Sequence, residues 1–129
     1  MPKFSARSLK NLEQCHPLLQ LLMYEAIKVS DFSVICGFRG EKEQNEAYTR
    51  GNSKLKWPQS KHNQTPSMAV DIVPYPIDWN DELRFRTLGA VVKEIWSQLP
   101  PEKKEGYELS WGGDWKTFKD LPHFELRKK

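Results

Sequence analysis

Two of the three histidines of this chain, His62 and His123, lie about sixty residues apart, yet with Asp71 they have the composition of one metal site. Two imidazoles and one carboxylate give three protein ligands, which leave a tetrahedral zinc ion one open position for water. The spacing is far wider than in a helical H-E-x-x-H motif and does not by itself fix the geometry. Such a site forms only if the fold brings distant segments together.

A carboxylate beside these ligands could act as a general base. Asp120 lies three residues before His123, and Pro122 stiffens the turn between them. If zinc is bound, the water in its open position can hydrolyse an amide. We predict that Asp120 takes a proton from this water and returns it to the amine that leaves. The alternatives are Asp114, in a Gly-Gly turn, and Glu125, which shares a strand face with His123.

Arg39 follows a predicted strand and is the candidate for binding developing negative charge. Its planar guanidinium could stabilise the oxyanion of a tetrahedral intermediate or hold a substrate carboxylate. The alternative is a surface arginine paired with Glu41 or Glu43.

Hydrophobic periodicity, together with the positions of proline and glycine, predicts alternating helices and strands. His16 is predicted to precede the first long helix because Pro17 is accepted at the first helical position. The coarse order is α, α, β, α, β, α, β, β, which favours an α+β domain with helices packed on a small antiparallel sheet. Helices are predicted at 17–29, 41–50 and about 80–99, and strands at 32–36, 69–73, 107–111 and 123–126.

Asp71 is a charge inside the apolar strand 69–73. Side chains alternate along a strand, so Val70 and Ile72 point to the opposite face from the carboxylate. We therefore expect Asp71 to require a charged or hydrogen-bonding partner.

Length and composition indicate one ordinary domain. The chain has 129 residues, of which 38% are hydrophobic, so a single domain spanning 1–129 is expected. No run of about 18 apolar residues and no apolar leader is found, so we expect neither membrane insertion nor secretion. Cys15 and Cys36 form no C-x-x-C pair and are predicted to be buried, reduced thiols.

The net charge of +3 comes from 20 basic and 17 acidic residues that are mostly interleaved, which does not indicate a nucleic-acid partner. The segment from Arg50 to Lys61 is an exception, because it carries four basic residues and no acidic one. It could attract an anionic polymer, or it could be a solvated loop.

Five motifs, spread over nearly the whole chain, together resemble a known family. It comprises zinc-dependent peptidases, among them phage endolysins that cleave L-alanyl-D-glutamate bonds, D-alanyl-D-alanine carboxypeptidases and vancomycin-resistance dipeptidases, and it shares its metal-site fold with Hedgehog signalling domains. The motifs are Phe4-Ser5-Ala6-Arg7-Ser8-Leu9 with His16-Pro17, Gly37-Phe38-Arg39 with Glu43-Gln44, Ser60-x-His62 through Ala69-Val70-Asp71, Trp111-Gly112-Gly113-Asp114-Trp115, and Asp120-x-x-His123.

The resemblance implies a Hedgehog/DD-peptidase-like fold and a defined set of site residues. Two of these residues border the substrate cleft, and the resemblance leaves their roles less defined. The set consists of the Zn²⁺ ligands His62, Asp71 and His123, the catalytic carboxylate Asp120, the carbonyl-facing Arg39, and the substrate-cleft residues Ser60 and Gln44.

Two features depart from the family pattern. Eight residues, 63–70, separate His62 from Asp71, where six including a glycine are usual. We expect this longer turn to alter the cleft wall and the substrate preference, and not the identity of the ligands. Several relatives carry a glutamate as the base, so the shorter Asp120 would require the water to lie closer to the backbone.

The resemblance implies an endolysin-type L-alanyl-D-glutamate endopeptidase that acts as a monomer on the stem peptides of peptidoglycan. A bacteriophage enzyme of this kind would accumulate in the host cytoplasm and reach the wall after another factor opened the membrane. One alternative is a D-alanyl-D-alanine carboxypeptidase or dipeptidase, with a pocket for a C-terminal carboxylate. The other is a non-catalytic, metal-stabilised module that binds the cell wall.

Overall fold

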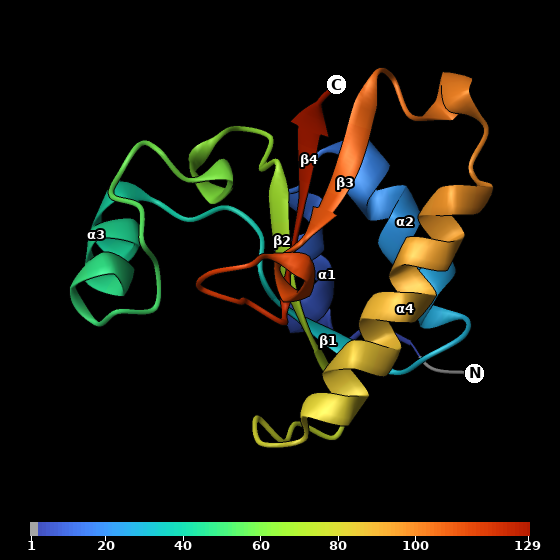
Figure 1. Ribbon diagram of the computed structural model, residues 1–129, viewed down its shortest axis with the longest axis horizontal. Coiled ribbons are helices and arrows are strands. Elements are labelled where there is room, and N and C mark those ends of the chain that lie inside the picture. The colour runs from blue at the N-terminus through green and yellow to red at the C-terminus, as the bar shows by residue number, and fades with distance from the viewer. Residues whose placement is uncertain (1–2) are drawn as a thin grey trace.

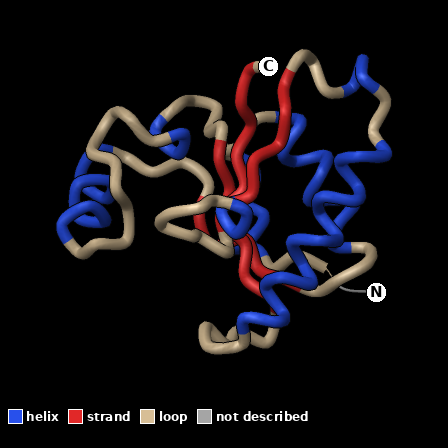
Figure 2. The backbone as a smooth tube through the Cα atoms, in the orientation of Figure 1, coloured by secondary structure: helices blue, strands red, loops and turns tan. Residues whose placement is uncertain are grey.

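A four-stranded antiparallel sheet, with strands in the order β1-β2-β4-β3, forms the centre of the computed structural model, which describes residues 3–129 (Figures 1 and 2). The mixed helix and sheet class predicted from the sequence is confirmed. The strands are β1 (Phe32–Cys36), β2 (Ala69–Pro74), β3 (Tyr107–Trp111) and β4 (His123–Lys128). The predicted single domain begins with residues 1 and 2, which lie outside the described residues.

Three helices share one hydrophobic core with the sheet, and a fourth lies apart from them (Figure 1). In the core, Leu12, Leu22 and Val92 are fully buried. The helices of the core are α1 (Ala6–Glu13), α2 (Pro17–Ile27) and α4 (Glu82–Gln98), and the separate helix is α3 (Glu41–Thr49). Residues 3–129 also contain three short 3-10 helices, namely η1 (Lys61–Asn63), η2 (Pro101–Lys103) and η3 (Gly112–Asp114).

Alternation along the central strands separates the core from the functional face. Val70 and Ile72 of β2 and Phe124 of β4 belong to the hydrophobic core. Asp71 and His123, at the intervening positions, line a cavity on the other side. The predicted direction of the Asp71 side chain is therefore confirmed, and the period of two along each strand explains it.

The predicted helix and strand boundaries differ from the observed ones by a few residues. The first long helix ends at Ile27, because the backbone N–H groups of Val29 and Ser30 both donate to Ala26 in a closing turn. The last strand continues to Lys128, paired with Tyr107. His16 caps α2 as predicted, and its Nδ1 accepts a hydrogen bond from the N–H of Leu18 at 3.0 Å.

Both cysteines are free thiols. Cys15 is buried as predicted, whereas Cys36 is only half-buried because it closes β1 at the edge of the sheet. Among residues 3–129, no helix combines the length and apolarity needed to cross a bilayer.

Candidate metal centre

The pairing of the two central strands brings Asp71 and His123 together. β2 and β4 are antiparallel, and their register places Asp71 directly opposite His123. His62 reaches the same place from η1. Ser60 begins η1 by accepting a hydrogen bond from the His62 N–H, and it forms a reciprocal capping box with Asn63.

One atom from each of the three predicted ligands meets at a common centre. His62 Nε2 lies 3.2 Å from Asp71 Oδ1 and 3.2 Å from His123 Nδ1, and His123 Nδ1 lies 3.1 Å from Asp71 Oδ1. Zinc bonds of about 2.0–2.2 Å in a tetrahedral arrangement place ligand atoms roughly 3.3–3.6 Å apart. This nearly equilateral triangle therefore fits one face of a zinc tetrahedron and leaves the fourth corner to the cavity.

The opposite nitrogen of each imidazole is held by a hydrogen-bond acceptor. His62 Nδ1 lies 2.8 Å from the carbonyl oxygen of Gly37, and His123 Nε2 lies 2.7 Å from Glu125 Oε1. A carbonyl or carboxylate oxygen only accepts, so in the neutral rings each of these nitrogens carries the proton. The lone pairs of His62 Nε2 and His123 Nδ1 therefore point at the common centre, as metal ligands require.

The Asp71 carboxylate makes the buried centre a strong attractor of positive charge. Burial by itself would lower the pKa of His62, but the Asp71 carboxylate outweighs it and raises that pKa to about 10. Burial would likewise raise the pKa of Asp71, but the two imidazoles hold it well below its usual value. Three acceptor atoms so close together repel one another unless a proton or a metal cation lies between them.

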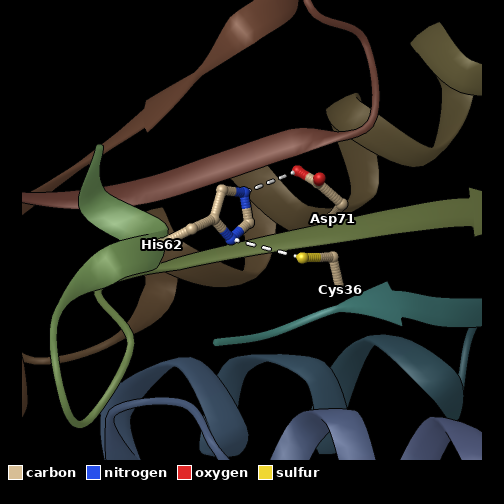
Figure 3. Close-up of side chains that lie close together, drawn as sticks. All are labelled: Cys36, His62 and Asp71. Carbon is tan, nitrogen blue, oxygen red and sulfur yellow. Dashed lines mark hydrogen bonds and ion pairs between the residues drawn. The ribbon is translucent and has the colours of Figure 1, made fainter. Parts of the chain in front are cut away.

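Cys36 is a neighbour of this centre that the sequence analysis missed. Its Sγ lies 3.8 Å from His62 Nδ1, and Figure 3 shows Cys36 and Asp71 on opposite sides of the His62 ring. The three side chains are close enough to form a metal-binding group. An ion held by His62 Nε2 and Asp71, however, faces away from the thiol, and Nδ1 is already bonded to Gly37. No spacing in the sequence links Cys36 to His62.

Asp120 lies beside the triangle. Its Oδ2 is 4.0 Å from His123 Nδ1, and it lines the cavity. Burial raises the pKa of Asp120, and the Asp71 carboxylate raises it further. The turn is held by a hydrogen bond from the Asp120 N–H to the Gly112 carbonyl, and a Cβ at Gly112 would clash with the Asp120 backbone.

The two alternative bases have other partners. Glu125 bonds to His123 Nε2 through one carboxylate oxygen and to Arg127 Nε at 2.8 Å through the other. Asp114 is exposed and pairs with Lys93 at 2.8 Å. The geometry therefore favours Asp120 over both.

Replacing Glu125 with alanine is expected to lower the affinity of this centre for a metal ion by about 10–100-fold, the usual effect of losing a carboxylate that orients a histidine ligand. The imidazole of His123 would lose the acceptor that fixes its tautomer. Competition with a calibrated chelator measures the affinity. Glu125→Gln keeps an acceptor oxygen and should retain more affinity than Glu125→Ala; equal affinity in all three proteins would contradict the role.

Arg39 lies against the candidate ligand Asp71 and not against the nearby acidic residues of α3. Its NH2 group is 3.3 Å from Asp71 Oδ2, and its NH1 group donates to Gln44 Oε1 at 3.2 Å. Among residues 3–129 the ion pairs include none between Arg39 and Glu41 or Glu43. The surface-arginine alternative is therefore wrong.

Gln44 does not border the cleft as predicted. Its side chain is fully buried, and Gln44 is absent from the cavity lining. Oε1 accepts from Arg39 and Asn63, and Nε2 donates to Ser53 Oγ and the Leu55 carbonyl. A buried amide needs all these partners, so Gln44 positions Arg39 and the following loop. Ser60, in contrast, lines the cavity, and its contact with substrate stays a prediction.

The longer turn between His62 and Asp71 packs away from the cleft. Ser67 forms a parallel bridge with Cys15, its N–H donates to Gln14 at 2.8 Å, and its carbonyl accepts from His16 at 2.9 Å. None of residues 63–70 lines the cavity of about 970 Å³ above the metal centre. The expectation that this turn shapes the cleft wall is therefore wrong, because the additional residues are bonded to the α1–α2 connection.

Comparisons with known proteins find that the chain is similar to peptidoglycan endopeptidases. A family model described as phage L-alanyl-D-glutamate peptidase matches residues 1–128. The peptidoglycan L-alanyl-D-glutamate endopeptidase CwlK of Bacillus subtilis (strain 168) is 33% identical over 128 residues, which cover 86% of this chain and 72% of CwlK. The crystal structure of Serratia marcescens L-Ala D-Glu endopeptidase ChiX is similar with a TM-score of 0.77 and 32% identity, and the match covers 98% of this chain and 90% of that chain.

Proposed function

The chain belongs to the phage L-alanyl-D-glutamate peptidase family and is an endopeptidase of peptidoglycan, and we propose that it works with a zinc ion held by His62, Asp71 and His123. The observation that carries the zinc proposal is the triangle of ligand atoms with both imidazole lone pairs directed inward. When bound, zinc acts as a Lewis acid toward the scissile carbonyl and lowers the pKa of water toward about 7.

Asp120 is the proposed general base. It lies beside the metal centre without serving a structural ion pair of the kind that occupies Glu125 and Asp114. A raised pKa suits a group that first accepts a proton and then returns it to the leaving amine. We assign both transfers to the Asp120 carboxylate.

Arg39 is the proposed stabiliser of negative charge on the substrate. Gln44 and Asp71 fix one side of its guanidinium, and Arg39 lines the cavity. The remaining N–H donors can bind the oxygen that becomes anionic during attack, which is worth several kcal/mol when donors are held in advance.

Removing the metal is expected to abolish hydrolysis, and one equivalent of zinc should restore it. The test incubates purified protein with a chelator, dialyses it, and follows peptidoglycan digestion by mass spectrometry before and after zinc is added. The expected new end is an N-terminal D-glutamate. Release of terminal D-alanine would instead support the carboxypeptidase alternative, and full activity without metal would refute the zinc proposal.

A further inference from the structure

The cavity above the metal centre has two chemically different rims. The loops 52–61 and 115–119 contribute the basic side chains of Lys54, Lys61, Lys116 and Lys119. Within residues 3–129 none of these four lysines forms an ion pair. The segment before α4 contributes Trp79 and no lysine, while the loop 115–119 also contributes Trp115 and Phe118. In Figure 1 that yellow segment lies below the sheet, and the green loop after α3 lies to its left.

Trp79 presents an exposed aromatic face in a fixed position. Its side chain is 58% exposed while its ring stacks on buried Phe85, with centroids 5.8 Å apart. The segment around it is bonded in place, because Asn80 N–H donates to Asp78 at 3.0 Å and Arg84 NH1 donates to the Pro76 carbonyl at 2.7 Å. A large exposed ring held this way at the edge of a site is typical of a binding surface.

Charge also distinguishes the rims. The segment 75–83 contains Asp78, Asp81 and Glu82 and no basic residue. Glu82 pairs with Arg86, and Arg84 NH1 donates to the Pro76 carbonyl, so this segment offers no excess of positive charge to an anionic group, whereas the lysines of the other rim attract one. A neutral ligand with hydroxyl groups and an apolar C–H face suits the rim of Trp79.

The substrate likewise carries a neutral sugar on one side of the scissile bond and a carboxylate on the other. In peptidoglycan the L-alanine of the stem peptide is joined through a lactyl group to muramic acid, so the glycan lies one residue from the scissile bond. One residue spans at most about 3.6 Å and the lactyl group adds a similar length, so the sugar lies within or at the rim of the cavity during cleavage. On the other side of the bond, D-glutamate keeps one carboxylate outside the peptide chain.

We propose that the substrate lies across the metal centre with its muramyl sugar stacked on Trp79 and its D-glutamate carboxylate directed to the lysine rim, where Lys61 is its main contact. This inference rests on the proposed endopeptidase function and adds the direction in which the chain is bound. Lys61 is the choice because it is half-buried and adjoins His62. Trp79 therefore contacts the glycan, and Lys61 binds the D-glutamate carboxylate.

The first test compares a free stem peptide with the same peptide attached to a GlcNAc–MurNAc disaccharide. Trp79→Ala should lower the ratio of kcat/KM for the glycan-linked substrate over the free peptide by roughly five- to tenfold, the range expected for one aromatic contact. Trp79→Phe should keep most of the ratio. Tyr75→Ala is the matched control, because Tyr75 is 57% exposed in the same segment but does not line the cavity.

A binding measurement keeps the test valid if Trp79→Ala folds poorly. Titration of the wild-type protein with GlcNAc–MurNAc alone should shift the indole N–H resonance that is missing in Trp79→Phe. An unchanged ratio in Trp79→Ala together with no indole shift would overturn the sugar contact. These results differ from failure of the proposed function, in which neither substrate would be cleaved by any of the proteins.

The proposed position of the D-glutamate carboxylate is tested with a stem peptide in which D-isoglutamine replaces D-glutamate. Lys61→Gln should reduce the preference for the acidic peptide by about threefold to tenfold, because one cation at the rim is lost. Lys10→Gln, on the remote helix α1, is the control. If Lys61→Gln leaves the preference unchanged while the wild type discriminates, the carboxylate does not lie at Lys61.

Discussion

Replacing His123 with alanine is expected to abolish zinc binding and peptide hydrolysis together. The imidazole supplies one of three converging ligand atoms, with its Nδ1 within 3.2 Å of both His62 Nε2 and Asp71 Oδ1. Two protein ligands do not hold zinc in a catalytic site of this type. We expect bound zinc to fall from about one equivalent to below about a tenth, and kcat/KM to fall by at least roughly a thousandfold.

His16 provides the matched control for this experiment, because it is the third histidine, and its ring caps α2 and packs against Tyr107. His16→Ala should keep its zinc and its activity while losing about 1 kcal/mol of stability, the usual effect of losing a cap. Elemental analysis of both proteins after gel filtration measures the metal, and circular dichroism reports the fold. Unchanged zinc content in His123→Ala would refute the assignment of this ligand.

The order of helices and strands could be predicted because each element is marked by local signals. Pro17, Gly51 and the Pro100-Pro101 pair stand close to helix ends, where backbone restrictions act within a few residues. The central strand 69–74 is marked by its apolar run and is buried along its whole length. Boundaries shifted because tertiary pairing extended β4 beyond its apolar residues.

The convergence of the ligands could be proposed from residue types, but their spacing along the chain does not determine it. It depends on the register of β2 with β4, which places Asp71 opposite His123, and on the capping box that fixes His62. Strand register is set by the hydrophobic patterns of both strands and by the turns between them, so one strand alone does not determine which residues face each other. The family motifs supplied what local reasoning could not.

The prediction that Gln44 borders the cleft is wrong for a different reason. Its motif position suggests a cleft residue, but the buried amide accepts hydrogen bonds from Arg39 and Asn63 and donates hydrogen bonds to Ser53 and Leu55. Polar residues in a motif can thus bind the residues that touch substrate. The same holds for Glu125. Its position on the strand face of His123 makes it a candidate base, but in the structure its carboxylate bonds to His123 Nε2.

Replacing Asp120 with asparagine is expected to lower kcat by about 10²–10⁴-fold while zinc remains bound, since this is the range that a general acid–base group contributes. Asparagine keeps the size and the backbone turn but cannot take a proton from water. The Asp120 side chain stands 4.0 Å from His123 Nδ1 and contributes no atom to the ligand triangle. Loss of turnover without loss of metal therefore separates this residue from the ligands.

Asp114→Asn is the control for that experiment, because Asp114 is an exposed aspartate in the same loop whose partner is Lys93. It should hydrolyse peptidoglycan at close to the wild-type rate. Asp120→Ala tests the same role with the whole carboxyl group removed. If wall lysis by Asp120→Ala stays near wild type, another group takes the proton, and Glu125 could do so only by leaving both His123 and Arg127. Because leaving His123 would also weaken the metal site, such a result would have to come with a lower zinc affinity, which the chelator competition would detect.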